Sequence, residues 1–189
     1  MRNIPVPVHV DRLNALADQF DRFRSELGST APLTGTDGLH QLSGYLRTSH
    51  ELTAEALAQL TAINGSQVTQ MKGALAALSC LAQIVQQAGL VSEGLTDSIA
   101  ANAYDGATWD PFADADKIGR GLRHLDARKA ILLHFGDAAS SLEICVEGCR
   151  IVAGHLDKEF PAGTSGPTEK SVAPVVTSPV SASGAGRRR

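Results

Sequence analysis

The sequence predicts an all-α protein, an elongated bundle of long helices with coiled-coil-like seams, followed by a disordered C-terminal tail. Three observations lead to this prediction. Apolar residues recur at spacings of three and four over most of residues 10–160, which is the period of an amphipathic helix. Aromatic residues make up only 4% of the chain, so the core must be aliphatic. Residues 161–189 are rich in Pro, Ser, Gly and Val, a composition typical of disordered segments.

The first predicted helix covers residues 10–27. Charged residues separate its apolar positions, and Gly28 is suited to end it. Pro5 and Pro7 predict an extended backbone for residues 1–9. The apolar positions follow a spacing of 3, 4, 3 and 4 and are Leu13, Leu16, Phe20, Phe23 and Leu27.

The middle of the chain is helical from about residue 39 to residue 88, with Asn64-Gly65 at its centre. Asn-Gly favours a turn, which would create an antiparallel hairpin. Within a helix the pair lowers helix stability by roughly 1–2 kcal/mol, which side-chain packing along a long helix can offset. We favour the second interpretation, a continuous helix of about 50 residues and roughly 75 Å. A separate short helix is expected at 92–104, followed by a linker.

The last predicted helix covers residues 116–160. Two apolar columns, each repeating every seven residues, predict an a/d seam. The first column is Ile118, Leu125, Leu132, Ala139, Val146, Ala153 and Phe160, and the second is Phe135, Leu142, Cys149 and Leu156. Leu133, Ile144 and Ile151 lie on the opposite side of this helix. A helix that is apolar on two sides is either central in a bundle or in contact with a partner, so these three are the candidate interaction residues.

Cys145, Cys149 and His155 raise the question of a metal or redox site. Both cysteines fall in apolar columns of the last helix, where free Cys acts as a small hydrophobic residue. His155 lies about 80° around the helix and about 15 Å along its axis from Cys145, too far for the three to share one ion. Cys80 is the only other thiol. We therefore predict core packing without metal or cofactor, and keep a metal or redox protein as an alternative.

Charge and composition limit the classes of partner that this chain is expected to bind. Residues 1–160 carry 13 basic and 19 acidic side chains, so nucleic acid is a poor partner. Three charges at Arg187–Arg189 are too few for strong phosphate binding. Residues 73–92 contain no charge and are long enough to span a bilayer. The Gln and Ser residues in this stretch favour a buried helix, so membrane association is the alternative.

Composition also bears on the setting and the domain organisation. Three cysteines lack the spacing of a disulfide framework, and the first residues lack the apolar run of a signal peptide, which predicts a reducing cytoplasm. Arg outnumbers Lys 12 to 5, in keeping with a GC-rich bacterial genome. We expect one helical domain over 1–160 and a tail over 161–189.

Motifs for enzymatic chemistry are absent from the sequence. It has neither the G-x-S-x-G of a nucleophile elbow nor a glycine-rich phosphate loop. The sequence therefore predicts a non-enzymatic interaction or assembly protein that acts through helix–helix contacts, with a protein partner or with a second copy.

Overall fold

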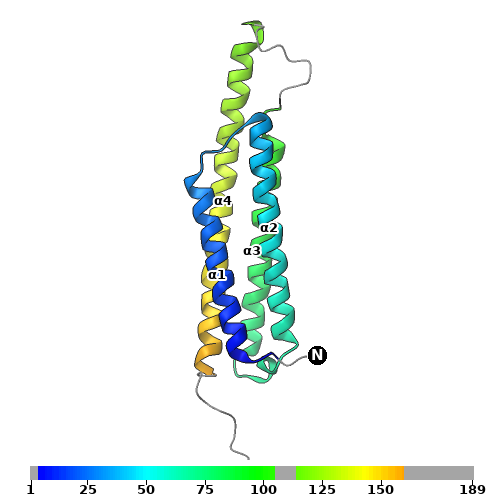
Figure 1. Ribbon diagram of the computed structural model, residues 1–189, viewed down its shortest axis with the longest axis vertical. Helices are drawn as coiled ribbons and strands as arrows, with labels where there is room; N and C mark the ends of the chain where they lie inside the picture. The colour runs from blue at the N-terminus through cyan, green and yellow to red at the C-terminus, as the bar shows by residue number, and fades with distance from the viewer. Residues whose placement is uncertain (1–3, 105–113, 160–189) are drawn as a thin grey trace, which may run out of the picture.

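The computed structural model describes residues 4–104 and 114–159. These residues form a four-helix bundle in which neighbouring helices run antiparallel (Figure 1). This confirms the prediction of an all-α bundle of long helices, whereas the predicted tail at 161–189 lies outside the described residues. The elements are α1 (Val6–Ser29), α2 (Gly35–Asn64), the short 3₁₀ helix η1 (Gln67–Gln70), α3 (Ala74–Ala101) and α4 (Asp114–Glu159).

The helices pack unequally around the core. Helix α4 packs closely against both α1 and α3, and α2 packs against α3, but α1 and α2 share few contacts. An aromatic cluster crosses the centre, with Phe23 of α1, Tyr45 of α2 and Phe135 of α4. Their ring centroids lie 6.0 Å apart for Phe23 and Tyr45 and 5.8 Å apart for Tyr45 and Phe135. The bundle is therefore closed on three sides and more open between α1 and α2.

Helix α1 begins earlier than the sequence predicted. Pro5 is its N-cap and Pro7 lies within its first turn, so the extended conformation expected through residue 9 is wrong from Val6 onward. Proline is tolerated in a first turn because the N–H that it lacks would have no partner inside the helix. The predicted apolar face is confirmed, since all five of its apolar side chains are buried.

The chain reverses direction at Asn64-Gly65, so the prediction of one continuous helix is wrong. Helix α2 ends at Asn64, and the Ser66 hydroxyl both donates to the Ile63 carbonyl at 2.8 Å and accepts from the Val68 amide at 3.2 Å. Val68 is fully buried at the end of the core. Folding back buries apolar faces from both halves against each other, which a single long helix cannot do.

The second half of the predicted long helix forms α3. It runs unbroken from Ala74 to Ala101, so the prediction of a separate helix at 92–104 is also wrong. A glycine in a helix interior costs only about 1 kcal/mol relative to alanine. Burial of Ala88 and Val91 on either side of Gly89 offsets that cost.

The seam of α4 differs in part from the predicted one. One row of buried side chains follows a spacing of 4, 3, 4, 3, 4, 3 and 4 and consists of Ile131, Phe135, Ala138, Leu142, Cys145, Cys149, Val152 and Leu156. The predicted second column is thus confirmed, but the first column is wrong over its N-terminal half. Ile118, Leu125 and Leu132 of that column are 78%, 47% and 51% exposed.

The end of α1 explains this difference. Arg24 of α1 lies 3.8 Å from Glu143 of α4, which shows the level at which these two antiparallel helices lie side by side. Helix α1 therefore lies beside Val146 and Ala153, which are buried, and it ends at Ser29 before it reaches the level of Leu132. The first predicted column of α4 is therefore buried where α1 lies beside it and exposed where α1 has ended.

Candidate interaction surface

Large exposed hydrophobic side chains concentrate on α4. Seven of the thirteen found among the described residues belong to this one helix. An isolated exposed leucine is normal on a soluble protein, whereas a contiguous exposed apolar patch marks a contact site, so the arrangement of these side chains along α4 is what matters. The seven are Ile118, Leu122, Leu125, Leu132, Leu133, Ile144 and Ile151.

The three predicted interaction residues lie on the outer side of α4. Leu133, Ile144 and Ile151 are 67%, 53% and 63% exposed. They are 11 and 7 residues apart, or about 16 and 10 Å along the axis, and the exposed Asp137 and Glu147 lie between them. The structure therefore places them on one side of the helix without joining them into a continuous patch.

A denser apolar strip lies at the N-terminal end of α4. Helix α4 has 46 residues, whereas the next longest helix has 30, and its first turns extend beyond the other helices (Figure 1). We call its exposed apolar residues the projecting stripe: Ile118 and Leu122 lie beyond the contact between His124 and Thr34, and Leu125 and Leu132 continue the stripe beside the bundle. Their spacing of 4, 3 and 7 residues keeps them on one face of the helix.

The sequence interpretation assigned most of this stripe to the intramolecular seam and missed Leu122. One signal in the sequence marks the buried set. The unbroken alternation of fours and threes from Ile131 to Leu156 marks the buried seam. Most of the projecting stripe belongs to a different column of α4, whose later residues are covered by α1.

The charge of the N-terminal part of α4 is opposite to that of the other helices. Residues 114–133 carry five basic and three acidic side chains, a net charge of +2. Helices α1–α3 together carry four basic and nine acidic side chains, a net charge of −5. The projecting stripe thus belongs to a positively charged segment attached to a negatively charged body.

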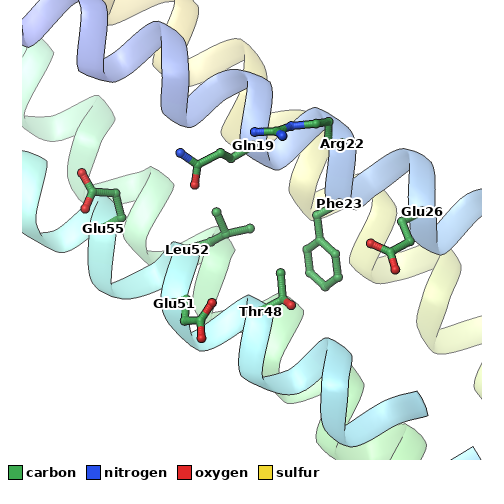
Figure 2. A pocket seen from close by; sticks show the side chains of 8 residues that line it. All are labelled: Gln19, Arg22, Phe23, Glu26, Thr48, Glu51, Leu52 and Glu55. Atoms are coloured by element: carbon green, nitrogen blue, oxygen red, sulfur yellow. The ribbon is translucent and has the colours of Figure 1, made fainter.

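A groove of about 510 Å³ lies between α1 and α2 on the open side of the bundle. Figure 2 shows Phe23 and Leu52 between the two helices, with polar side chains on either side. We call this the α1–α2 groove. Its walls are Gln19, Arg22 and Glu26 from α1 and Thr48, Glu51 and Glu55 from α2. Three carboxylates and one guanidinium give the groove a net charge of −2.

The three cysteines lie around the contact between α3 and α4, and all three are free thiols. Cys80 Sγ lies 3.8 Å from the Gly148 carbonyl oxygen, and Cys145 Sγ lies 3.6 Å from that of Ile84. Burial raises the pKa of Cys145 to about 12, and burial together with the neighbouring thiols of Cys145 and Cys80 raises that of Cys149 to about 12. The predicted core positions of Cys145 and Cys149 are confirmed.

The residues described here contain no group of three His, Cys, Asp or Glu side chains arranged to hold a metal ion. His155 instead meets the α2–α3 connection, where its Nε2 lies 3.1 Å from the Lys72 carbonyl oxygen. It lines an apolar cavity of about 200 Å³ that also includes Cys80 and Ile151. This cavity brings together a thiol and an imidazole that the sequence left apart.

Helix α3 is long and apolar enough to cross a membrane by length and composition, and it is the one such helix in the described part of the chain. Only 28% of its most apolar window is buried in the bundle. The exposed remainder includes Leu75 and Leu90 and carries no charge before Glu93. This agrees with the uncharged stretch in the sequence and gives the first part of α3 an outer face without charge.

No protein-family model, curated protein or solved structure matches this chain. Inference about its function therefore rests on the fold and on these surfaces.

Proposed function

We propose that this chain is a non-enzymatic, cytoplasmic interaction protein that assembles through helix–helix contacts made by α4. The observation that carries the proposal is the presence of seven exposed large aliphatic side chains on that one helix. Fully burying such a side chain is worth roughly 1.5–3 kcal/mol. Burying several half-exposed aliphatic side chains can therefore supply enough free energy to exceed the entropic cost of association.

The predicted residues Leu133, Ile144 and Ile151 belong to this surface as outlying contacts, and the projecting stripe supplies its densest part. A helix that extends beyond its own bundle is accessible from most sides, so a partner helix can lie along it without displacing α1 or α3. This geometry favours a partner of elongated shape over a small molecule.

The proposal is tested by measuring the mass of the full chain in solution over a range of concentrations by light scattering. We expect a mass above the 19.8 kDa of one chain, and a lower mass for the variant that combines Ile144→Asp with Ile151→Asp. The helix content of that variant should match that of the native protein, because both positions are exposed. A native protein that stays at 19.8 kDa at every concentration would remove the support for self-association.

A membrane-associated role is the second candidate, because α3 has an uncharged outer face with exposed leucines. Flotation of the purified chain with phospholipid vesicles tests it. The third candidate, a metal or redox protein, has weaker support. The two buried cysteines have a raised pKa, and the thiolate is the form that attacks disulfides and binds metals.

A further inference from the structure

The projecting stripe and the α1–α2 groove differ in shape and in charge. The stripe is a row of exposed side chains on one helix, which begins beyond the bundle and continues beside it, whereas the groove is a concavity between two helices. The stripe lies in a segment of net charge +2 and the groove walls have a net charge of −2. Two surfaces of one molecule are thus complementary in both properties.

Their dimensions agree as well. The groove walls span Gln19 to Glu26 on α1 and Thr48 to Glu55 on α2, about 10 Å on each helix. The segment of α4 from Leu122 to Lys129, which holds Leu122 and Leu125 of the stripe, spans the same length. Each wall presents residues at spacings of three and four, the arrangement that accepts the ridge of a further helix.

The two surfaces cannot meet within one chain. Helix α4 extends past the end of the bundle, and Thr34 Oγ1 lies 2.7 Å from His124 Nδ1, which holds α4 beside the loop that joins α1 to α2. The groove lies further down the bundle, where Phe23 and Leu52 form its floor. The stripe of one copy can therefore reach only the groove of another copy.

We propose that the projecting stripe of one copy docks in the α1–α2 groove of a second copy of this chain. Leu122 and Leu125 lie over Phe23 and Leu52, of which 3% and 5% is exposed at the floor of the groove. The nearby Lys129, whose Nζ lies 3.8 Å from Oδ1 of Asp126 on the same helix, faces the carboxylates of the groove walls. This rests on the proposed function, since it names the partner of the α4 surface. The contact joins two different surfaces, so it extends into rings or open chains instead of stopping at a symmetric dimer.

Charge argues against the simplest competing contact, in which the stripes of two copies pair with each other. That arrangement brings together two segments of net charge +2 each. The groove offers opposite charge together with an apolar floor. The association is consequently expected to weaken as salt rises, because these side chains are exposed and their attraction is screened.

The test uses two variants of the full chain. The stripe variant carries Leu122→Gln and Leu125→Gln, which remove apolar surface while keeping good helix formers. The groove variant carries Glu26→Lys and Glu51→Lys, one change on each wall. Glu55 is left intact because it accepts a hydrogen bond from the buried Gln59.

Each variant has a matched control. Leu57→Gln with Leu75→Gln removes the same kind of exposed side chain from other helices, and Glu93→Lys with Asp97→Lys makes the same number of charge reversals on α3. All four positions are exposed. Circular dichroism and thermal melting establish that every variant folds like the native chain.

We expect the native chain to associate, and each variant alone to show a dissociation constant raised by at least about tenfold, as for central interface residues. The two controls should associate like the native chain. The decisive result comes from mixing the variants. The intact groove of the stripe variant accepts the intact stripe of the groove variant. No further copy can add to this pair, because its remaining stripe and its remaining groove are both altered. Equal amounts should therefore form a one-to-one dimer of twice 19.8 kDa.

Three outcomes would overturn this proposal. If the groove variant associates like the native chain, the groove is not the partner, although the proposed function stands. If both variants are monomeric and their mixture stays monomeric, the two surfaces do not bind each other. If the native chain is monomeric in solution and binds vesicles of anionic phospholipid through the stripe, the proposed self-association fails together with this contact.

Discussion

Oγ1 of Thr34 and Nδ1 of His124 lie 2.7 Å apart, and this contact marks the level at which α4 leaves the bundle. On the C-terminal side of His124, α4 is increasingly enclosed by its neighbours. On the N-terminal side it continues for ten residues, from Asp114 to Arg123. One helix therefore serves as core over part of its length and as exposed surface over the rest.

Leucine-to-alanine substitutions on α4 should separate these two parts. Leu142→Ala is expected to lower the free energy of unfolding by about 2–5 kcal/mol, because it leaves a cavity in a fully buried seam. Leu132→Ala should cost less than about 1 kcal/mol, since half of that side chain is exposed. Urea denaturation of both variants measures the difference, and equal losses would mean that Leu132 is covered in solution.

The connection between α2 and α3 should depend on one of its two glycines. Gly73 has a φ of 82°, and a β-carbon there would lie 2.7 Å from His155 Nε2. Gly73→Ala is expected to lower stability by about 1–2 kcal/mol from the backbone conformation alone, with a further loss from displacing His155. Gly65→Ala is the control, because its φ is −90° and its nearest contact would be 3.5 Å. Thermal melting should show a lower Tm for Gly73→Ala only.

His9 should make the fold sensitive to acid. It is fully buried, and neither ring nitrogen has a hydrogen-bond partner among the described residues. Burial, with a smaller contribution from the nearby Arg12, lowers the pKa of His9. The folded state thus favours the neutral form of His9. The free energy of unfolding is fully retained above pH 6.5, which is about the pKa of His9 in the unfolded chain, and it falls as the pH drops below that value, because the unfolded chain then binds the proton more readily.

Substituting His9 by leucine provides the check. His9→Leu should raise the free energy of unfolding at pH 7 by about 1 kcal/mol or more, because it removes an unsatisfied buried polar group. Below pH 6.5, the free energy of unfolding of this variant should decrease less steeply with falling pH than that of the native protein. An unchanged acid slope in the variant would show that other groups control the pH dependence.

The three thiols should differ in reactivity. Cys145 and Cys149 are fully buried and their pKa is about 12, so at pH 8 they should react with a thiol reagent only as fast as the protein opens. Cys80 is partly exposed, and its pKa is raised by burial, so it should react first. All three should titrate in denaturant. Fast modification of Cys149 in the native state, or about one zinc per chain by elemental analysis, would contradict their assignment to the core.

Several features of this protein follow from local sequence. The apolar spacing of residues 13–27 predicts the buried face of α1, and the repeat from Phe135 to Leu156 predicts the core of α4. The positions of Cys145 and Cys149 within apolar columns predict their burial. These inferences succeed because helical periodicity is a property of neighbouring residues, which the sequence displays directly.

Other features depend on residues far apart in the chain. Asn64-Gly65 is compatible with both a turn and a helix, and the burial of Val68 at the end of the core favours the turn. Leu132 continues a regular apolar column, yet it is exposed because α1 ends at Ser29. The α1–α2 groove is made by two helices that share few contacts. Periodicity alone thus determined which faces of the helices are apolar. The tertiary structure decided which of those faces are covered, because coverage depends on where neighbouring helices begin, end and approach one another.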